Sequence, residues 1–159
     1  MQEAAAKWPS LRASYPDLRL HMIGQLQSNK AAEAVDLFDT IHSLDRLTLL
    51  DALVAAGTKA RHFPDCFVQV NVGAEEQKGG VAVADLGDFI DRVRSTPLPL
   101  MGLMCIPPAG LEPAPFFAFL SELARRHDVT GLSMGMSADY ETAVMLGATH
   151  VRIGGALFD

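Results

Sequence analysis

The sequence is poor in the residues that mark disulfide-rich and metal-binding proteins. Only two of its 159 residues are cysteines, Cys66 and Cys105, and their spacing does not match a metal-binding pair. Two cysteines in a domain of this size are typical of reduced thiols in a hydrophobic core. The five histidines include no H-x-x-x-H pair, so no metal site is predicted.

Basic residues and long apolar runs are also scarce. Lys and Arg number 13 against 19 Asp and Glu, a formal net charge of −6. A nucleic-acid surface needs clustered Lys and Arg, so the charge argues against one. No apolar run reaches the roughly 20 residues of a membrane span, and the N-terminus lacks the basic-then-apolar order of a signal peptide. We therefore expect a cytoplasmic, soluble protein with no membrane or nucleic-acid partner.

Strand-like and helix-like apolar patterns alternate along the chain. Six short strands are predicted, at 18–23, around Ile41, and at 66–71, 100–106, 131–134 and 150–153. Helices are predicted at 1–14, 30–38, from Ser43 or Asp45 to Gly57, and at 83–93, 116–126 and 139–146. Because the strands alternate with helices, residues 1–159 are expected to form one domain around a parallel sheet.

Small polar turns follow the last two predicted strands. Ser133, Gly135 and Ser137 are predicted to form one turn, and Gly154 and Gly155 the other. Backbone N–H groups and hydroxyls that converge beside a helix N-terminus bind phosphate well, although glycines and serines also form turns without a ligand. The phosphate candidates are Ser133, the backbone of Met134, Ser137, Gly154 and Gly155.

Arg152 stands in the last predicted strand, between the apolar residues Val151 and Ile153. If its side chain points to the inside of the fold, it is a buried cation that needs a partner. If it points outward, it pairs with a surface carboxylate. The residues alone leave both readings open.

Four motifs in order carry a family resemblance: H-M-I-G-Q-L-Q-S-N-K at 21–30, V-N-V-G-A-E-E-Q-K-G-G-V at 70–81, G-L-M-C-I-P-P at 102–108, and S-M-G-M-S-A-D-Y-E-T-A with G-A-T-H-V-R-I-G at 133–154. Together they resemble the pyridoxal phosphate (PLP) homeostasis proteins, which are single-domain relatives of the alanine racemase barrel. The resemblance implies a (β/α)8 TIM-barrel fold and PLP as the cofactor. It also implies a protein that holds and transfers PLP, with PLP-dependent apoenzymes as partners, without strong catalysis of its own.

The resemblance also implies roles for single residues. Arg152 resembles the arginine that faces the pyridine nitrogen, and an arginine that keeps its proton would donate to an unprotonated ring nitrogen. His21 and Ile23 lie in a region that flanks the cofactor, but a satisfied, partly buried histidine explains His21 equally well. No residue of this chain is predicted to be catalytic.

The predicted strands are too few for a closed barrel. A (β/α)8 barrel has eight strands and about 250 residues, and six strands are predicted here. The resemblance implies that the first two strands are absent, one of which carries the lysine that forms the Schiff base with PLP. We therefore expect an N-terminally truncated PLP-binding barrel domain that is unstable alone or self-associates through its open edges.

Three different functions are also compatible with the sequence. The first is a PLP-dependent enzyme of the racemase type, which needs the cofactor lysine and usually a tyrosine from a second domain as its two bases. Tyr15 and Tyr140 are predicted in a turn and at a helix start, which favours the binding protein. The second is a barrel that binds a different phosphorylated metabolite, and the third is a fragment that no longer binds PLP covalently.

Overall fold

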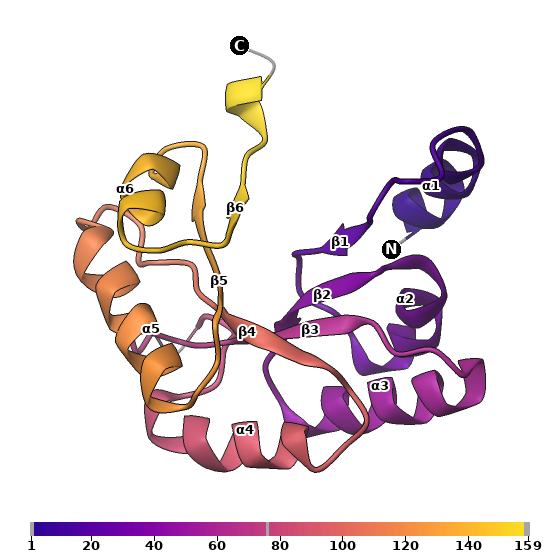
Figure 1. The fold of residues 1–159 in the computed structure, drawn as a ribbon, viewed down its shortest axis with the longest axis horizontal. Helices are drawn as coiled ribbons and strands as arrows, with labels where there is room; N and C mark the ends of the chain where they lie inside the picture. The colour runs from indigo at the N-terminus through magenta and orange to yellow at the C-terminus, as the bar shows by residue number, and fades with distance from the viewer. Residues whose placement is uncertain (1, 76, 158–159) are drawn as a thin grey trace.

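A single parallel sheet organises the fold. The computed structural model describes residues 2–75 and 77–157 and arranges their strands in the order β1-β2-β3-β4-β5-β6, each parallel to its neighbours (Figure 1). The strands are β1 His21–Met22, β2 Thr40–Leu44, β3 Asp65–Gln69, β4 Leu100–Met104, β5 Gly131–Met136 and β6 His150–Arg152. The parallel sheet predicted from the alternating pattern is confirmed.

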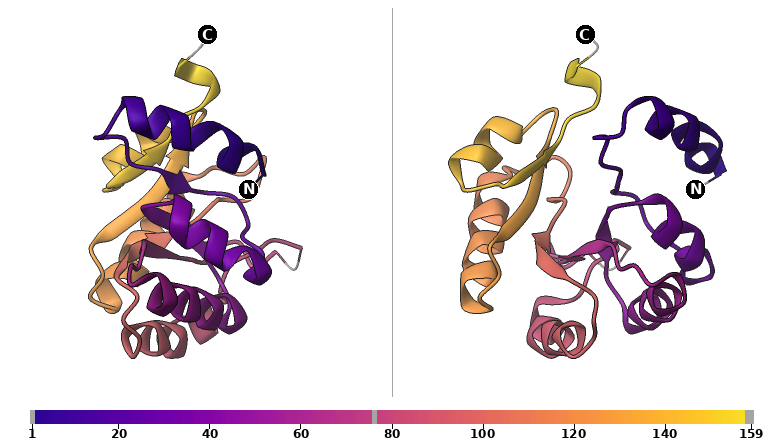
Figure 2. Two further views of the ribbon diagram at one scale, coloured as in Figure 1. Left: turned by 90° about the vertical axis from the view of Figure 1, so that its right-hand side faces the viewer. Right: turned by 45° about the vertical axis from the view of Figure 1, so that its right-hand side comes forward.

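Helices connect the strands. The α-helices are α1 Gln2–Ser14, α2 Ala31–Leu37, α3 Leu47–Ala60, α4 Leu86–Arg94, α5 Ala114–Arg126 and α6 Tyr140–Met145, and the short 3-10 helices are η1 Ser28–Lys30, η2 Val83–Asp85 and η3 Gly155–Leu157. Figures 1 and 2 show α2 to α6 on the outer side of the curled sheet. Among the described residues, none of these helices combines the length and apolar surface that a bilayer crossing requires.

The sheet curls into part of a (β/α)8 barrel. Strands that follow one another in the sequence are neighbours in the sheet, and the helices between them pack on one side of it. The sheet curves so that this helix-covered side is convex. β1 and β6 form its two edges. The partial barrel predicted from the sequence is confirmed.

The two faces of the sheet bury different side chains. The outer face packs against the helices through residues such as Cys66, Val68 and Leu103, which belong to one continuous hydrophobic core. On the inner face Phe67 lies across the strands, and a Cβ added at Gly131 would come within 2.9 Å of its ring. The small residues of β5 therefore make room for an aromatic ring on the concave side.

Several predicted boundaries were wrong. Ser133 and Gly135 belong to β5 rather than to a turn, and Gly135 has a φ of +92° where the register between β5 and β6 shifts. A Cβ at Gly135 would lie 2.6 Å from the Cβ of Ala143, so the strand needs glycine to bring α6 this close. The predicted strand at 18–23 is only the two residues of β1.

The helix predicted to end at Gly57 continues to Ala60. Arg61 then takes the left-handed conformation, with a φ of 56°, and its N–H donates to the Gly57 carbonyl. At the other end, Ser43 is buried inside β2, and Arg46 precedes α3 without any side-chain cap. The glycine inside the helix is explained by packing, because a Cβ at Gly57 would lie 2.4 Å from the Phe63 ring.

Candidate functional site

A cavity of about 660 Å³ lies at the concave side of the sheet, between the edge strands β1 and β6 and the end of β5. A volume of this size suits a small-molecule ligand. Its lining residues come mainly from two separate parts of the chain, and they are His21, Ile23, His42, Met136, Ser137, Thr149, His150, Val151, Arg152, Ile153, Gly154 and Gly155.

The structure brings most of the predicted site residues together. The members that line this cavity are His21, Ile23, Ser137, Arg152, Gly154 and Gly155. Ser133 does not line it but lies fully buried beside Arg152, and Met134 is buried in the hydrophobic core on the helix-covered face. The part that each residue plays in cofactor binding stays a prediction.

Arg152 points to the inside of the curved sheet. Side chains alternate along a strand, so His150 and Arg152 share the inner face while Val151, between them, takes the other. One guanidinium nitrogen, Nη1, donates to Ser133 Oγ at 2.8 Å, and Nη2 donates to the Cys105 carbonyl at 2.9 Å. Arg152 is therefore an inward-pointing cation and does not form the alternative surface ion pair.

Among the described residues, no carboxylate forms an ion pair with Arg152, and Asp139 acts on its charge only from a longer distance. None of the ion pairs formed within residues 2–75 and 77–157 includes this side chain. Burial lowers the pKa of its guanidinium, yet arginine does not lose its proton in proteins. A half-buried cation held only by neutral acceptors attracts an anion or a lone pair into the cavity.

The turns after β5 and β6 lie side by side, as the strand order requires. The Gly154 N–H donates to Ser137 Oγ at 3.2 Å, which joins the two turns. A Cβ added at Gly154 would meet no atom within 4 Å, so open space adjoins this backbone. The helix that follows the β5 turn, α6, begins at Tyr140, and the contribution of its N-terminus to phosphate binding stays a prediction.

Sequence reasoning missed the two other histidines of the site, His42 and His150. His42, from β2, is only 2% exposed and stacks on Phe67 with 4.6 Å between ring centroids. Its Nε2 lies 2.9 Å from His21 Nδ1, and its Nδ1 lies 2.8 Å from Ser133 Oγ. His150, from β6, meets Phe67 edge-on at 5.0 Å. A histidine inside a predicted apolar strand was the available signal for His42.

The surroundings of His42 and His21 lower the pKa of both side chains, which favours their neutral forms. Burial is the main cause that lowers the pKa of His42 to about 3, and nearby His21, His150 and Arg152 lower it further. Burial, and then His150, also lower the pKa of His21. Within the described residues, no three His, Cys, Asp or Glu side chains are placed to hold a metal ion.

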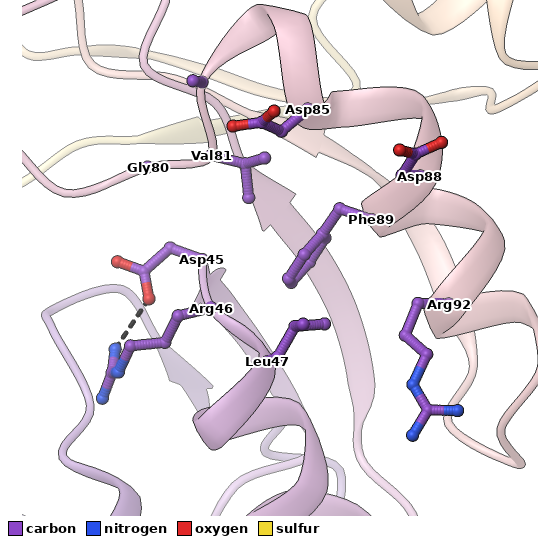
Figure 3. A pocket seen from close by; sticks show the side chains of 10 residues that line it. Asp45, Arg46, Leu47, Gly80, Val81, Asp85, Asp88, Phe89 and Arg92 are labelled. Carbon is purple, nitrogen blue, oxygen red and sulfur yellow. Dashed lines mark hydrogen bonds and ion pairs between the residues drawn. The ribbon is translucent and has the colours of Figure 1, made fainter.

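A second cavity, of about 510 Å³, lies between the starts of α3 and α4 (Figure 3). Leu47 and Phe89 form its apolar floor, and acidic and basic side chains surround them. At its edge, Arg46 forms an ion pair with Asp45 at 2.7 Å. None of the predicted site residues lines this cavity.

Comparison with known proteins identifies the family. All residues 1–159 match the model of the alanine racemase N-terminal domain. A pyridoxal phosphate homeostasis protein of Aquifex aeolicus is 40% identical over 99% of this chain and 73% of its own length. The chain belongs to the pyridoxal phosphate homeostasis protein family. The family predicted from the four motifs is thus confirmed.

Other members of the pyridoxal phosphate homeostasis family agree. The Pseudomonas aeruginosa protein is 41% identical, with 99% of this chain and 70% of that protein covered. The structure of PipY from Synechococcus elongatus PCC7942, solved with PLP bound, has a TM-score of 0.91 and 36% sequence identity, covering 99% of this chain and 78% of that one. The family fold therefore extends over the chain described here.

Proposed function

We propose that this chain binds pyridoxal 5′-phosphate in the cavity between β1, β5 and β6, and holds and transfers it without strong catalysis of its own. The names of its relatives and the PLP-bound PipY structure support the ligand. The observation that carries the proposal is Arg152, a half-buried cation on the cavity wall with only neutral hydrogen-bond acceptors. PLP offers this cation an acceptor.

The residues of the cavity suit the parts of PLP. A guanidinium has five N–H donors, of which Ser133 and Cys105 take two, so the remaining donors of Arg152 are free for the ring nitrogen. Ser137 and Gly154 adjoin open space in which a phosphate would fit. Bound PLP is an electron sink, and an arginine that keeps its proton weakens that property. The site thus favours storage over chemistry.

The proposed binding is non-covalent, without a Schiff base. The sequence contains four lysines, and none of the described residues that line the cavity is one of them. Lys30, in η1, forms an ion pair with Glu33 at 2.6 Å. Borohydride reduction after mixing with PLP should leave the intact mass of the chain unchanged. A stoichiometric adduct on one lysine would refute this part of the proposal.

The test of binding is a titration with PLP followed by absorbance. Arg152→Met should weaken binding about tenfold or more, because hydrogen bonds from a charged group contribute about 1.5–3 kcal/mol. Arg125→Met is the matched control, since Arg125 lies on α5 and pairs with Glu122 at the surface. Equal affinity of the Arg152 variant and the control, or tighter binding of a sugar phosphate than of PLP, would contradict the proposal.

Two further features belong to this proposal. PLP-dependent apoenzymes of the cytoplasm are the recipients we infer, and transfer would appear as recovery of apoenzyme activity faster than PLP dissociates into solution.

Self-association is the second feature, since β1 and β6 each have a free edge among the described strands, and such edges favour pairing with another chain. A monodisperse monomer in sedimentation velocity would exclude it.

A further inference from the structure

A chain of hydrogen bonds crosses the concave face of the sheet from one edge strand to the other. Arg152, on β6, donates to Ser133 Oγ on β5 at 2.8 Å. Ser133 Oγ lies 2.8 Å from His42 Nδ1 on β2, and His42 Nε2 lies 2.9 Å from His21 Nδ1 on β1. Four side chains from four strands therefore share one continuous network.

The chemistry of its members gives this network a direction. Arginine has only donors, so the Ser133 oxygen accepts from Arg152. Ser133 is fully buried, and its single hydroxyl hydrogen needs an acceptor. Among the described residues the acceptor within reach is His42 Nδ1. That nitrogen must therefore lack a proton, which agrees with the neutral state that burial imposes on this imidazole.

The same donor-to-acceptor direction continues from His42 through His21 to the cavity. A neutral His42 without a proton on Nδ1 carries it on Nε2, so Nε2 donates to His21 Nδ1. His21 then carries its own proton on Nε2. His21 lines the cavity, and no described residue forms a hydrogen bond with its Nε2.

We propose that His42 is a positioning residue, which orients Ser133 and through it Arg152, and which makes His21 a hydrogen-bond donor to the ligand of the cavity. This inference rests on the proposed PLP site for its consequence, but the network itself does not. The ligand needs hydrogen-bond acceptors at two separate places, one for Arg152 and one for His21. A pyridine that carries an oxygen anion is a ligand class with both.

The first test reads the histidine tautomers directly. In ¹⁵N-histidine-labelled protein at neutral pH, long-range ¹⁵N–¹H spectra should show His42 and His21 each as the Nε2–H tautomer. Exposed His62 serves as the internal reference, because a free imidazole averages between its forms. A proton on Nδ1 of His42, or an averaged signal like that of the reference, would overturn the proposal whether or not PLP binds.

The second test separates positioning from packing with two variants. His42→Phe keeps a ring against Phe67 but removes both hydrogen bonds, and it should weaken PLP binding about tenfold. His42→Asn offers an oxygen near the position of Nδ1 but no donor to His21, so it should keep Ser133 and Arg152 in place and recover part of the PLP affinity that the phenylalanine variant loses. Equal PLP affinity of wild type and the phenylalanine variant would overturn the positioning role.

A readout without PLP keeps the two proposals distinguishable. Exchange of the Arg152 guanidinium N–H protons with water should be slow in the wild type and His42→Asn, and fast in His42→Phe. If the wild type fails to bind PLP while these exchange rates and the tautomers are as expected, the proposed function fails and the positioning role stands. Equal Arg152 exchange in all three proteins would overturn the positioning role.

Discussion

Acidification should destabilise this protein through His42. Its side chain is buried beside His21, His150 and Arg152, and its pKa is lowered from 6.5 to about 3. In the unfolded chain the same imidazole regains its ordinary pKa near 6.5. Between these two values the unfolded state binds the proton and the folded state does not, so stability falls as pH drops below about 6.5.

The size of the effect follows from the pKa difference. Each pH unit between the two pKa values costs about 1.4 kcal/mol. The loss reaches about 2 kcal/mol at about pH 5, and about 5 kcal/mol below the folded pKa of about 3. The pKa of His21 is lowered too, which adds in the same direction. A domain with about 5–15 kcal/mol of stability loses a large share of it.

Urea unfolding followed by circular dichroism at neutral pH and at about pH 5 measures this loss. With a urea dependence of about 2 kcal/mol per M, the midpoint of the wild type should drop by about 1 M. His42→Phe keeps the ring contact with Phe67 but has no proton to bind. The urea midpoint of this variant should therefore drop by clearly less than about 1 M between the two pH values. Carboxylates that titrate in this range are the same in both proteins, so their effect cancels in the comparison.

The outcome is read from the pH dependence and not from absolute stability, since the phenylalanine variant leaves Ser133 without its acceptor. If the wild type and His42→Phe lose the same free energy of unfolding between neutral pH and about pH 5, the protonation of His42 does not cause that loss. The electrostatic reasoning about this site would then be refuted.

Three further predictions test the packing around the site. Gly102→Ala should cost about 2–3 kcal/mol in urea unfolding, because a Cβ there would lie 2.0 Å from the Gly131 carbonyl oxygen, and a smaller loss would contradict the packing. Burial raises the pKa of Cys105 to about 12, so an aromatic disulfide reagent should label it only after unfolding, and labelling of the folded protein would argue against a buried thiol. Asp39→Ala should speed hydrogen exchange of the Leu20 amide, which donates to Asp39 Oδ2 at 2.8 Å, and should cost about 1–2 kcal/mol, whereas unchanged exchange would show that the edge strand is held otherwise.

The order and type of the elements could be predicted because they depend on local patterns. Apolar residues at helical spacing and short β-branched runs predicted the alternating helices and strands that the sheet contains. The boundaries were harder, because packing decides them. β5 extends past Ser133 through its pairing with β6, and α3 continues to Ala60, with Gly57 inside it because Phe63 leaves no room for a side chain there.

The site could be predicted only in part for the same reason. The motifs pointed to Ser137, Arg152 and Gly154, which lie in or next to a single βαβ unit and meet through neighbouring strands. His42 was missed because its partner Ser133 is 91 residues away in the sequence. Contacts of this kind form only when the sheet curls, and no local pattern encodes them.

The sequence by itself determined the family, the alternation of strands and helices, and the small polar turns that follow the last two strands. Each of these depends on the order of residues along the chain. Only the tertiary structure decided that Arg152 turns inward to Ser133 and Cys105, and that His21, His42 and His150 gather beside it. The physical reason is that burial, charge and the direction of a hydrogen bond are set by atoms from distant strands.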